Sequence, residues 1–176
     1  MFRLALLLLC LTAAWPAQSD SGPLDQEQRD WARVGELSRS RHLPVVVLIS
    51  SKDCGYCERL KSEVLSPMLQ DGSLTHRAVF GEVSRYSGGK IVDFDGERMR
   101  TRIFVDRYRV FAYPTLLFLD ARGQPLHQPL VGYNGRAGYR PLLLEALEQS
   151  RAAMHELPDH GDTAGVTPAD SDQFGS

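Results

Sequence analysis

The chain has 176 residues, of which 43% are hydrophobic and 24% charged, enough to build one modest globular core but not two. Its 20 Lys and Arg residues against 22 Asp and Glu residues give a formal net charge of −2, so a nucleic-acid-binding protein is disfavoured. The longest strongly apolar stretch lies at the N-terminus and no second stretch of that length follows, which excludes a protein with several membrane spans.

That N-terminus has the layout of a secretory signal peptide. Arg3 supplies one charge, residues 4–14 are almost wholly apolar, and a short exit segment leads to Ser19. The apolar part is shorter than the roughly 20 residues that a membrane span needs. We therefore expect residues 1–19, including Cys10, to be removed, and the mature protein to work in an oxidising, exported compartment.

The apolar pattern predicts one small α/β domain over residues 24–154. In chain order we expect a helix over 24–41, a strand over 43–50, a helix over 54–69, a strand over 76–83, a loop or short hairpin over 88–96, a helix over 101–108, a strand over 115–120, a weaker strand ending near 131 and a helix over 140–154. This order implies a mixed sheet between helical layers. Residues 155–176 hold several acids but no Lys or Arg, which predicts a disordered tail.

A cysteine pair, Cys54-Gly55-Tyr56-Cys57, lies where the first predicted strand gives way to a helix. The first turn of a helix has unpaired N–H groups and the positive end of the helix dipole, which favour a thiolate at Cys54. Cys57 falls on the apolar side of the same helix, in line with Leu60. This asymmetry predicts that Cys54 attacks a substrate disulfide and that Cys57 resolves the resulting mixed disulfide.

Other uses of a cysteine pair fit less well. A zinc site needs four ligands, and neither a second cysteine pair nor a closely spaced histidine pair lies near Cys54. Covalent haem attachment needs His after the second cysteine, where this chain has Glu58. A purely structural disulfide across so short a loop would restrict the unfolded chain little. We therefore expect a redox pair that uses neither a metal nor an organic cofactor.

The cysteine pair at a helix start, followed later by Tyr113-Pro114-Thr115 entering a strand, resembles the thioredoxin-fold superfamily over residues 30–153. The stretches 90–96 and 113–120 are similar to periplasmic thioredoxin-related proteins associated with sulfur oxidation. Gly-Tyr as the intervening dipeptide is also found in the bacterial periplasmic disulfide isomerases, but this chain has no room for their separate dimerisation domain. The resemblance implies a thioredoxin fold and a periplasmic location.

The resemblance also implies the residues that meet the substrate. Pro114 corresponds to the family's cis-proline, which would place the backbone of Tyr113 beside the cysteines, ready to pair with an extended substrate segment. Gly55 and Tyr56, between the cysteines, would lie on the same surface. The two tyrosines fit ordinary packing equally well, so both interpretations stay open at this point.

One departure from the family concerns proton transfer. Thioredoxins carry a buried acid six positions before the first cysteine, where this chain has Leu48. Deprotonation of Cys57 would then depend on water or on a nearby group, for which the candidates are Glu58, Glu63 and Lys52.

These observations together predict a monomeric, exported thiol-disulfide oxidoreductase that acts on disulfides of protein substrates. The resemblance to envelope reductants favours a reductase over an oxidase or isomerase, and a reductase outside the cytoplasm would need electrons from a membrane partner. The alternative is a thioredoxin-fold binding module or chaperone that holds a thiol-bearing client without turnover. Such a module has no need of a resolving thiol, so the presence of Cys57 favours the enzyme.

Overall fold

The computed structural model describes residue 24 and residues 26–156. The predicted signal peptide and all but the first two residues of the predicted acidic tail lie outside this part of the chain. No helix within the described residues combines the length and apolar character that a membrane crossing requires.

A four-stranded sheet forms the centre of the domain, in the order β2 (Val79–Ser84), β1 (Val45–Ser50), β5 (Thr115–Leu119) and β6 (Pro125–Val131). Strand β1 runs parallel to β2 and antiparallel to β5, and β5 runs antiparallel to β6. Every residue of the two inner strands is buried, as expected for continuously apolar strands with helices on both faces. The predicted mixed sheet is confirmed.

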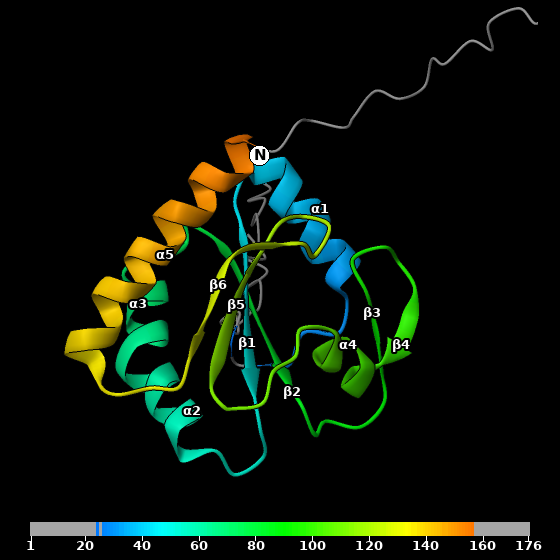
Figure 1. Ribbon diagram of the computed structural model, residues 1–176, viewed down its shortest axis with the longest axis horizontal. Coiled ribbons are helices and arrows are strands. Elements are labelled where there is room, and N and C mark those ends of the chain that lie inside the picture. Colours follow the sequence, from blue (N-terminus) through cyan, green and yellow to red (C-terminus); the bar gives the residue numbers. More distant parts are fainter. Residues whose placement is uncertain (1–23, 25, 157–176) are drawn as a thin grey trace, which may run out of the picture.

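Helices cover both faces of this sheet (Figure 1). On one side lie α2 (Gly55–Leu60), a π-helical turn η1 (Lys61–Leu65), α3 (Ser66–Gln70) and the long α5 (Arg136–Glu156). On the other side lie α1 (Trp31–Arg41) and α4 (Thr101–Arg107), next to a small hairpin of β3 (Lys90–Val92) and β4 (Arg98–Arg100). The layered arrangement that the sequence predicts is therefore present.

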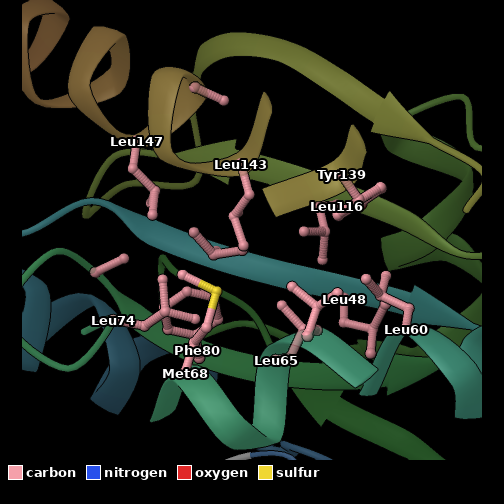
Figure 2. Close-up of a cluster of buried hydrophobic side chains, with 14 of the residues drawn as sticks. Leu48, Leu60, Leu65, Met68, Leu74, Phe80, Leu116, Tyr139, Leu143 and Leu147 are labelled. Atoms are coloured by element: carbon pink, nitrogen blue, oxygen red, sulfur yellow. The ribbon is translucent and has the colours of Figure 1, made fainter. Parts of the chain in front are cut away.

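Alternate residues of β1 enter two separate cores. Leu48 belongs to the cluster under α2, α3 and α5, with Leu65 and Leu143 from the helices (Figure 2). Val47 belongs to the opposite cluster, where Trp31 stacks on Phe104 with ring centroids 5.5 Å apart. This alternation fixes which residues of the neighbouring strands face the α2 layer.

Two helix boundaries differ from the sequence prediction. Helix α1 begins at Trp31, because Asp30 caps it by accepting the N–H of Arg33 at 3.0 Å. The preceding residues are not helical: the Gln28 N–H donates to the carbonyl oxygen of Glu82 at 2.8 Å, so this segment follows the edge of β2. A helix prediction from apolar spacing alone does not see this pairing.

Helix α5 was predicted to begin near residue 140, but it begins at Arg136 and continues to Glu156. Pro141 consequently lies inside the helix and not in its first turn, so one backbone N–H of the ladder is missing there. His155 and Glu156, which we assigned to the tail, end this helix.

Candidate redox site

The site begins where β1 ends and α2 starts. After Ser50 a short loop leads to Asp53, whose φ of 56° turns the chain, and Cys54 then occupies the N-cap position of α2. The Sγ of Cys54 accepts the backbone N–H of Cys57 at 3.2 Å, and the carbonyl oxygen of Cys54 accepts the same N–H at 3.0 Å. One N–H of the first helical turn, that of Cys57, is thus directed at the Cys54 sulfur.

Cys54 and Cys57 form a disulfide, with their Cα atoms 5.2 Å apart. Cys57 is buried, with 1% of its surface exposed, whereas Cys54 is only partly buried. Gly55 and Tyr56 between them are exposed. A substrate that approaches from solvent therefore meets the Cys54 side of the pair first.

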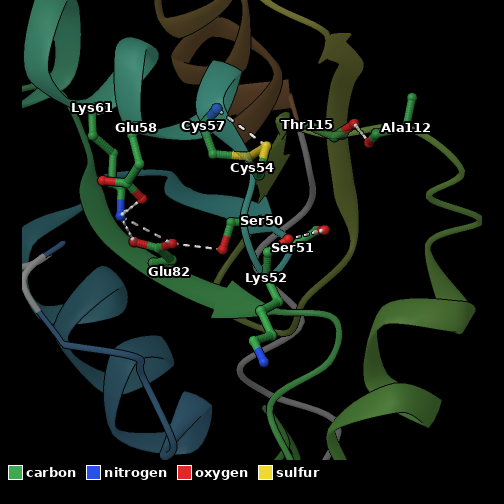
Figure 3. Close-up of a disulfide and its surroundings, with 10 residues drawn as sticks. All are labelled: Ser50, Ser51, Lys52, Cys54, Cys57, Glu58, Lys61, Glu82, Ala112 and Thr115. Atoms are coloured by element: carbon green, nitrogen blue, oxygen red, sulfur yellow. Dashed lines mark hydrogen bonds and ion pairs between the residues drawn. A yellow bond between two sulfur atoms is a disulfide. The ribbon is translucent and has the colours of Figure 1, made fainter.

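The Tyr113–Pro114 peptide bond is cis and leads directly into β5, the strand next to β1. Thr115 closes this turn by donating its hydroxyl to the carbonyl oxygen of Ala112 at 2.8 Å, as drawn in Figure 3. The carbonyl oxygen of Pro114 accepts the N–H of Gly132 at 2.8 Å.

Several aromatic rings at this end of the molecule reach solvent. Tyr56 is 59% exposed, so it is not a core residue. Tyr113 packs against the core under α4 and meets the ring of Tyr86 edge to face, with centroids 6.4 Å apart. Tyr86 and Phe111 are 68% and 89% exposed. Sequence reasoning did not identify Tyr86 or Phe111, since only the fold shows that nothing covers them.

A buried ion pair lies under the disulfide helix. The Glu82 carboxylate on β2 accepts the hydroxyl of Ser50 at 2.6 Å and pairs with Nζ of Lys61 at 3.2 Å. Lys61 also pairs with Glu58 at 2.9 Å. Figure 3 shows Glu82 between the end of β1 and the helix that carries Cys57. Burial lowers the pKa of Lys61, but its bonds to Glu58 and Glu82 outweigh that effect and raise the pKa overall.

The three groups expected to assist Cys57 are exposed or engaged elsewhere. The side chain of Glu58 is 72% exposed, and Lys52 is exposed. Glu63 pairs with Arg59 and accepts the Tyr133 hydroxyl at 2.5 Å, and these two contacts lower its pKa. Sequence reasoning missed Glu82, whose only signal was an acid close to the apolar residues 78–80 and Val83 of the predicted strand.

No group of three or more His, Cys, Asp and Glu side chains suited to a metal ion occurs within the described residues. Buried charged side chains in this part of the chain are limited to Glu82 and Asp93. Asp93 lies on the α4 side and pairs with Arg107 at 2.6 Å.

Comparison with known proteins places this geometry in a family. The family of thioredoxin-like domains matches residues 36–147, which is more than half of the chain. The chain belongs to the thioredoxin-like family. With a Cys-x-x-Cys disulfide at the N-terminus of α2, it is a thiol-disulfide oxidoreductase of this family. No curated protein matches the sequence.

Solved structures with the same fold include a thioredoxin from Thermus thermophilus, which is 22% identical with a TM-score of 0.51 and covers 78% of this chain and 99% of its own. DsbH oxidoreductase is 20% identical with a TM-score of 0.50 and covers 69% of this chain and 84% of its own. The periplasmic thioredoxin SoxS from Paracoccus pantotrophus is 16% identical with a TM-score of 0.44, covering 61% and 98%. At these identities the likeness concerns the fold.

Proposed function

We propose that this thioredoxin-like oxidoreductase is an exported reductase of protein disulfides, with Cys54 as the attacking thiol and Cys57 as the resolving thiol. The observation that carries the proposal is the difference in accessibility between the two sulfurs. Cys54 caps the helix at the surface, whereas Cys57 is buried beneath it. A substrate disulfide can reach the Cys54 sulfur from solvent. The buried Cys57 sulfur can react only with a sulfur already held at the site, that of Cys54.

The reaction follows from this arrangement. The Cys54 thiolate attacks one sulfur of a substrate disulfide, which releases the other substrate sulfur as a thiolate. The Cys57 thiolate then attacks the Sγ of Cys54, which releases the remaining substrate sulfur and forms the Cys54–Cys57 disulfide. Two electrons pass to the substrate, and the enzyme is left in the oxidised form that the structure contains. A dithiol donor must reduce it before the next cycle.

The surface around Cys54 suits a polypeptide substrate. The Tyr113–Pro114 turn lies at the start of β5, where its backbone can pair with an extended segment, and Gly55 leaves the approach to the disulfide open. Exposed rings, Tyr56 among them, offer apolar contacts on either side of that segment. Because a small disulfide would use little of this area, we assign protein disulfides as the substrate.

The proposed location and partner rest on the N-terminal sequence. Residues 1–19 have the charge, apolar core and exit segment of a signal peptide, which supports export to the periplasm. In an oxidising compartment the Cys54–Cys57 pair stays reduced only if a donor supplies electrons. A membrane dithiol carrier is the proposed source, and the protein acts as a monomer without metal or organic cofactor.

The direction of the reaction is tested by the reduction potential of the Cys54–Cys57 pair, measured by equilibrating the protein with a glutathione series. A reductase should lie towards the thioredoxin end of the family's range, about −270 mV. A value near the oxidising end, about −120 mV, would contradict the assignment and favour an oxidase.

Turnover separates the enzyme from a binding module. We expect wild-type protein to catalyse reduction of insulin disulfides, and Cys57→Ser to lose turnover while it accumulates a mixed disulfide through Cys54. A Cys54→Ser variant should form no mixed disulfide. Equal retention of client protein by the wild type and by a variant with both cysteines replaced by Ser, without turnover, would instead identify a binding module.

A further inference from the structure

The Glu82 carboxylate is buried, and taking a carboxylate out of water costs free energy. Its side chain is 9% exposed and Lys61 is 19% exposed, so both charges have left most of their water. An ion pair in such a place rarely stabilises a fold more than apolar side chains of the same size would. Buried titratable groups next to a reactive pair are more common where the chemistry uses them.

The Cys57 thiol needs a proton acceptor, and Glu82 is a candidate. To resolve the mixed disulfide, the Cys57 thiol must lose its proton, since the thiolate is the nucleophile. With 1% of Cys57 exposed, bulk water has little access to that proton. The charged groups near the disulfide in sequence, Glu58 and Lys52, are exposed to solvent.

The register of the sheet places Glu82 on the side of Cys57. Glu82 pairs with Leu48 of β1, and Leu48 and Phe80 both enter the core under α2. Because strand residues two apart share a face, Glu82 and Ser50 face the same helical layer. Lys61 follows Cys57 by one helical turn, so the ammonium that holds Glu82 lies on the same side of the helix as Cys57.

We propose that Glu82 accepts the proton of the Cys57 thiol when Cys57 resolves the mixed disulfide, and returns it when the pair is reduced. The carboxylate takes the proton and becomes a carboxylic acid. The Cys57 thiolate attacks the Sγ of Cys54, and the bond from Cys54 to the substrate breaks. The substrate leaves as a thiolate and takes its proton from solvent. This inference rests on the proposed resolving role of Cys57.

The charged groups around Glu82 are few. Lys61 approaches from η1, and Glu58 on α2 reaches Glu82 only through its shared contact with Lys61. From β1 the contact is the neutral Ser50 hydroxyl. The Gln28 N–H of the segment beside β2 donates to the main-chain carbonyl oxygen of Glu82 and not to its carboxylate, and Glu27 of that segment pairs with Arg29. The Glu82 carboxylate therefore faces one cation, Lys61, and accepts one neutral hydroxyl, that of Ser50.

The test separates the two cysteine steps with dithiobis(nitrobenzoate), an aromatic disulfide that releases a coloured thiolate at each step. Reduced protein should release the first equivalent when Cys54 attacks and the second when Cys57 resolves. In Glu82→Gln we expect the first release to be unchanged and the second to slow by at least about tenfold at neutral pH, the lower range for a lost general base being about a hundredfold. Glu63→Gln, which removes a half-buried carboxylate of the same helical layer that contacts Arg59 and Tyr133, should match the wild type.

The pH dependence of the second release distinguishes loss of a proton acceptor from a folding defect in Glu82→Gln. In wild-type protein the second release should depend on an ionisation below that of a free thiol, about 8.5, and Glu82→Gln should lose that dependence. Glu82→Asp, which keeps a carboxylate, should restore part of it. A second release that depends only on a thiol ionisation in the wild type, or that is equally fast in Glu82→Gln, would overturn the role of Glu82. Absence of the second release from wild-type protein would instead contradict the resolving role of Cys57.

Discussion

Cys54 and Cys57 are separated by only two residues, yet they occupy very different surroundings. The strand that precedes them delivers Cys54 to the helix N-cap, and one helical turn then carries Cys57 under the helix. This difference could be predicted from spacing alone. Cys57 lies three residues before the apolar Leu60 and therefore on the same, buried side of the helix, whereas Cys54 precedes the helix. Cys54 is thereby available for attack and Cys57 for resolution.

We expect the Asp53 carboxylate to oppose the stabilisation of the Cys54 thiolate by the helix end. Its carboxylate is next in sequence to the sulfur-bearing residue, and a neighbouring negative charge disfavours a thiolate. Asp53→Asn removes the charge and keeps a residue that tolerates the φ of 56° found there. We expect reduced Asp53→Asn to alkylate at Cys54 faster than wild type, by about threefold at low ionic strength.

The control for this prediction is Lys52→Gln, which removes an exposed positive charge on the same loop and should slow alkylation of Cys54. Both effects should shrink at high salt, since exposed charges are screened. Equal rates in Asp53→Asn and wild type would show that the Asp53 carboxylate does not affect the reactivity of Cys54.

At the scale of elements, close packing of α1 depends on a glycine. A Cβ built on Gly35 would lie 2.5 Å from the carbonyl oxygen of Ala121, a backbone atom that cannot turn aside. Gly35→Ala should therefore push α1 from the sheet and lower the free energy of unfolding by about 1–3 kcal/mol, seen as a lower urea midpoint.

Gly138 provides the matched control, because it also lies in a helix but its Cβ would come no closer than 3.8 Å to Asn134. Gly138→Ala should leave stability unchanged or raise it by about 0.5–1 kcal/mol. If Gly35→Ala is as stable as Gly138→Ala, then α1 does not pack as closely as the structure shows.

Which elements could be predicted depended on how far the relevant contacts lie along the chain. The inner strands β1 and β5 were predicted to within a few residues, since continuous apolar runs follow from burial on both faces. The start of α1 was wrong because the residues before it pair with the edge of β2, a contact that local spacing does not contain. Pro141 suggested a helix start nearby, but the helix tolerates it in its interior.

At the scale of the whole molecule, one end of the sheet gathers residues that are distant in sequence. Cys54 follows β1, the Tyr113–Pro114 turn precedes β5, and Glu82 lies near the end of β2. The first two were predicted, the cysteines from their spacing and the proline turn from resemblance to thioredoxins. Glu82 could not be, since its place beside the helix depends on the register between β1 and β2.

Two cores enclose the sheet at this end. The cluster under α2, α3 and α5 packs against the helix that carries Cys57, and the cluster under α1 and α4 packs against Tyr113. We expect the two sulfurs to keep their unequal access to solvent in the reduced protein.

The most direct measurement of that inequality is alkylation of fully reduced protein with limiting iodoacetamide at neutral pH, followed by mass spectrometry of the peptides that contain Cys54 and Cys57. The structure predicts that Cys54 is modified well before Cys57 in the folded protein, and that the difference disappears in denaturant. Equal rates at the two cysteines in the folded protein, or faster modification of Cys57, would contradict it.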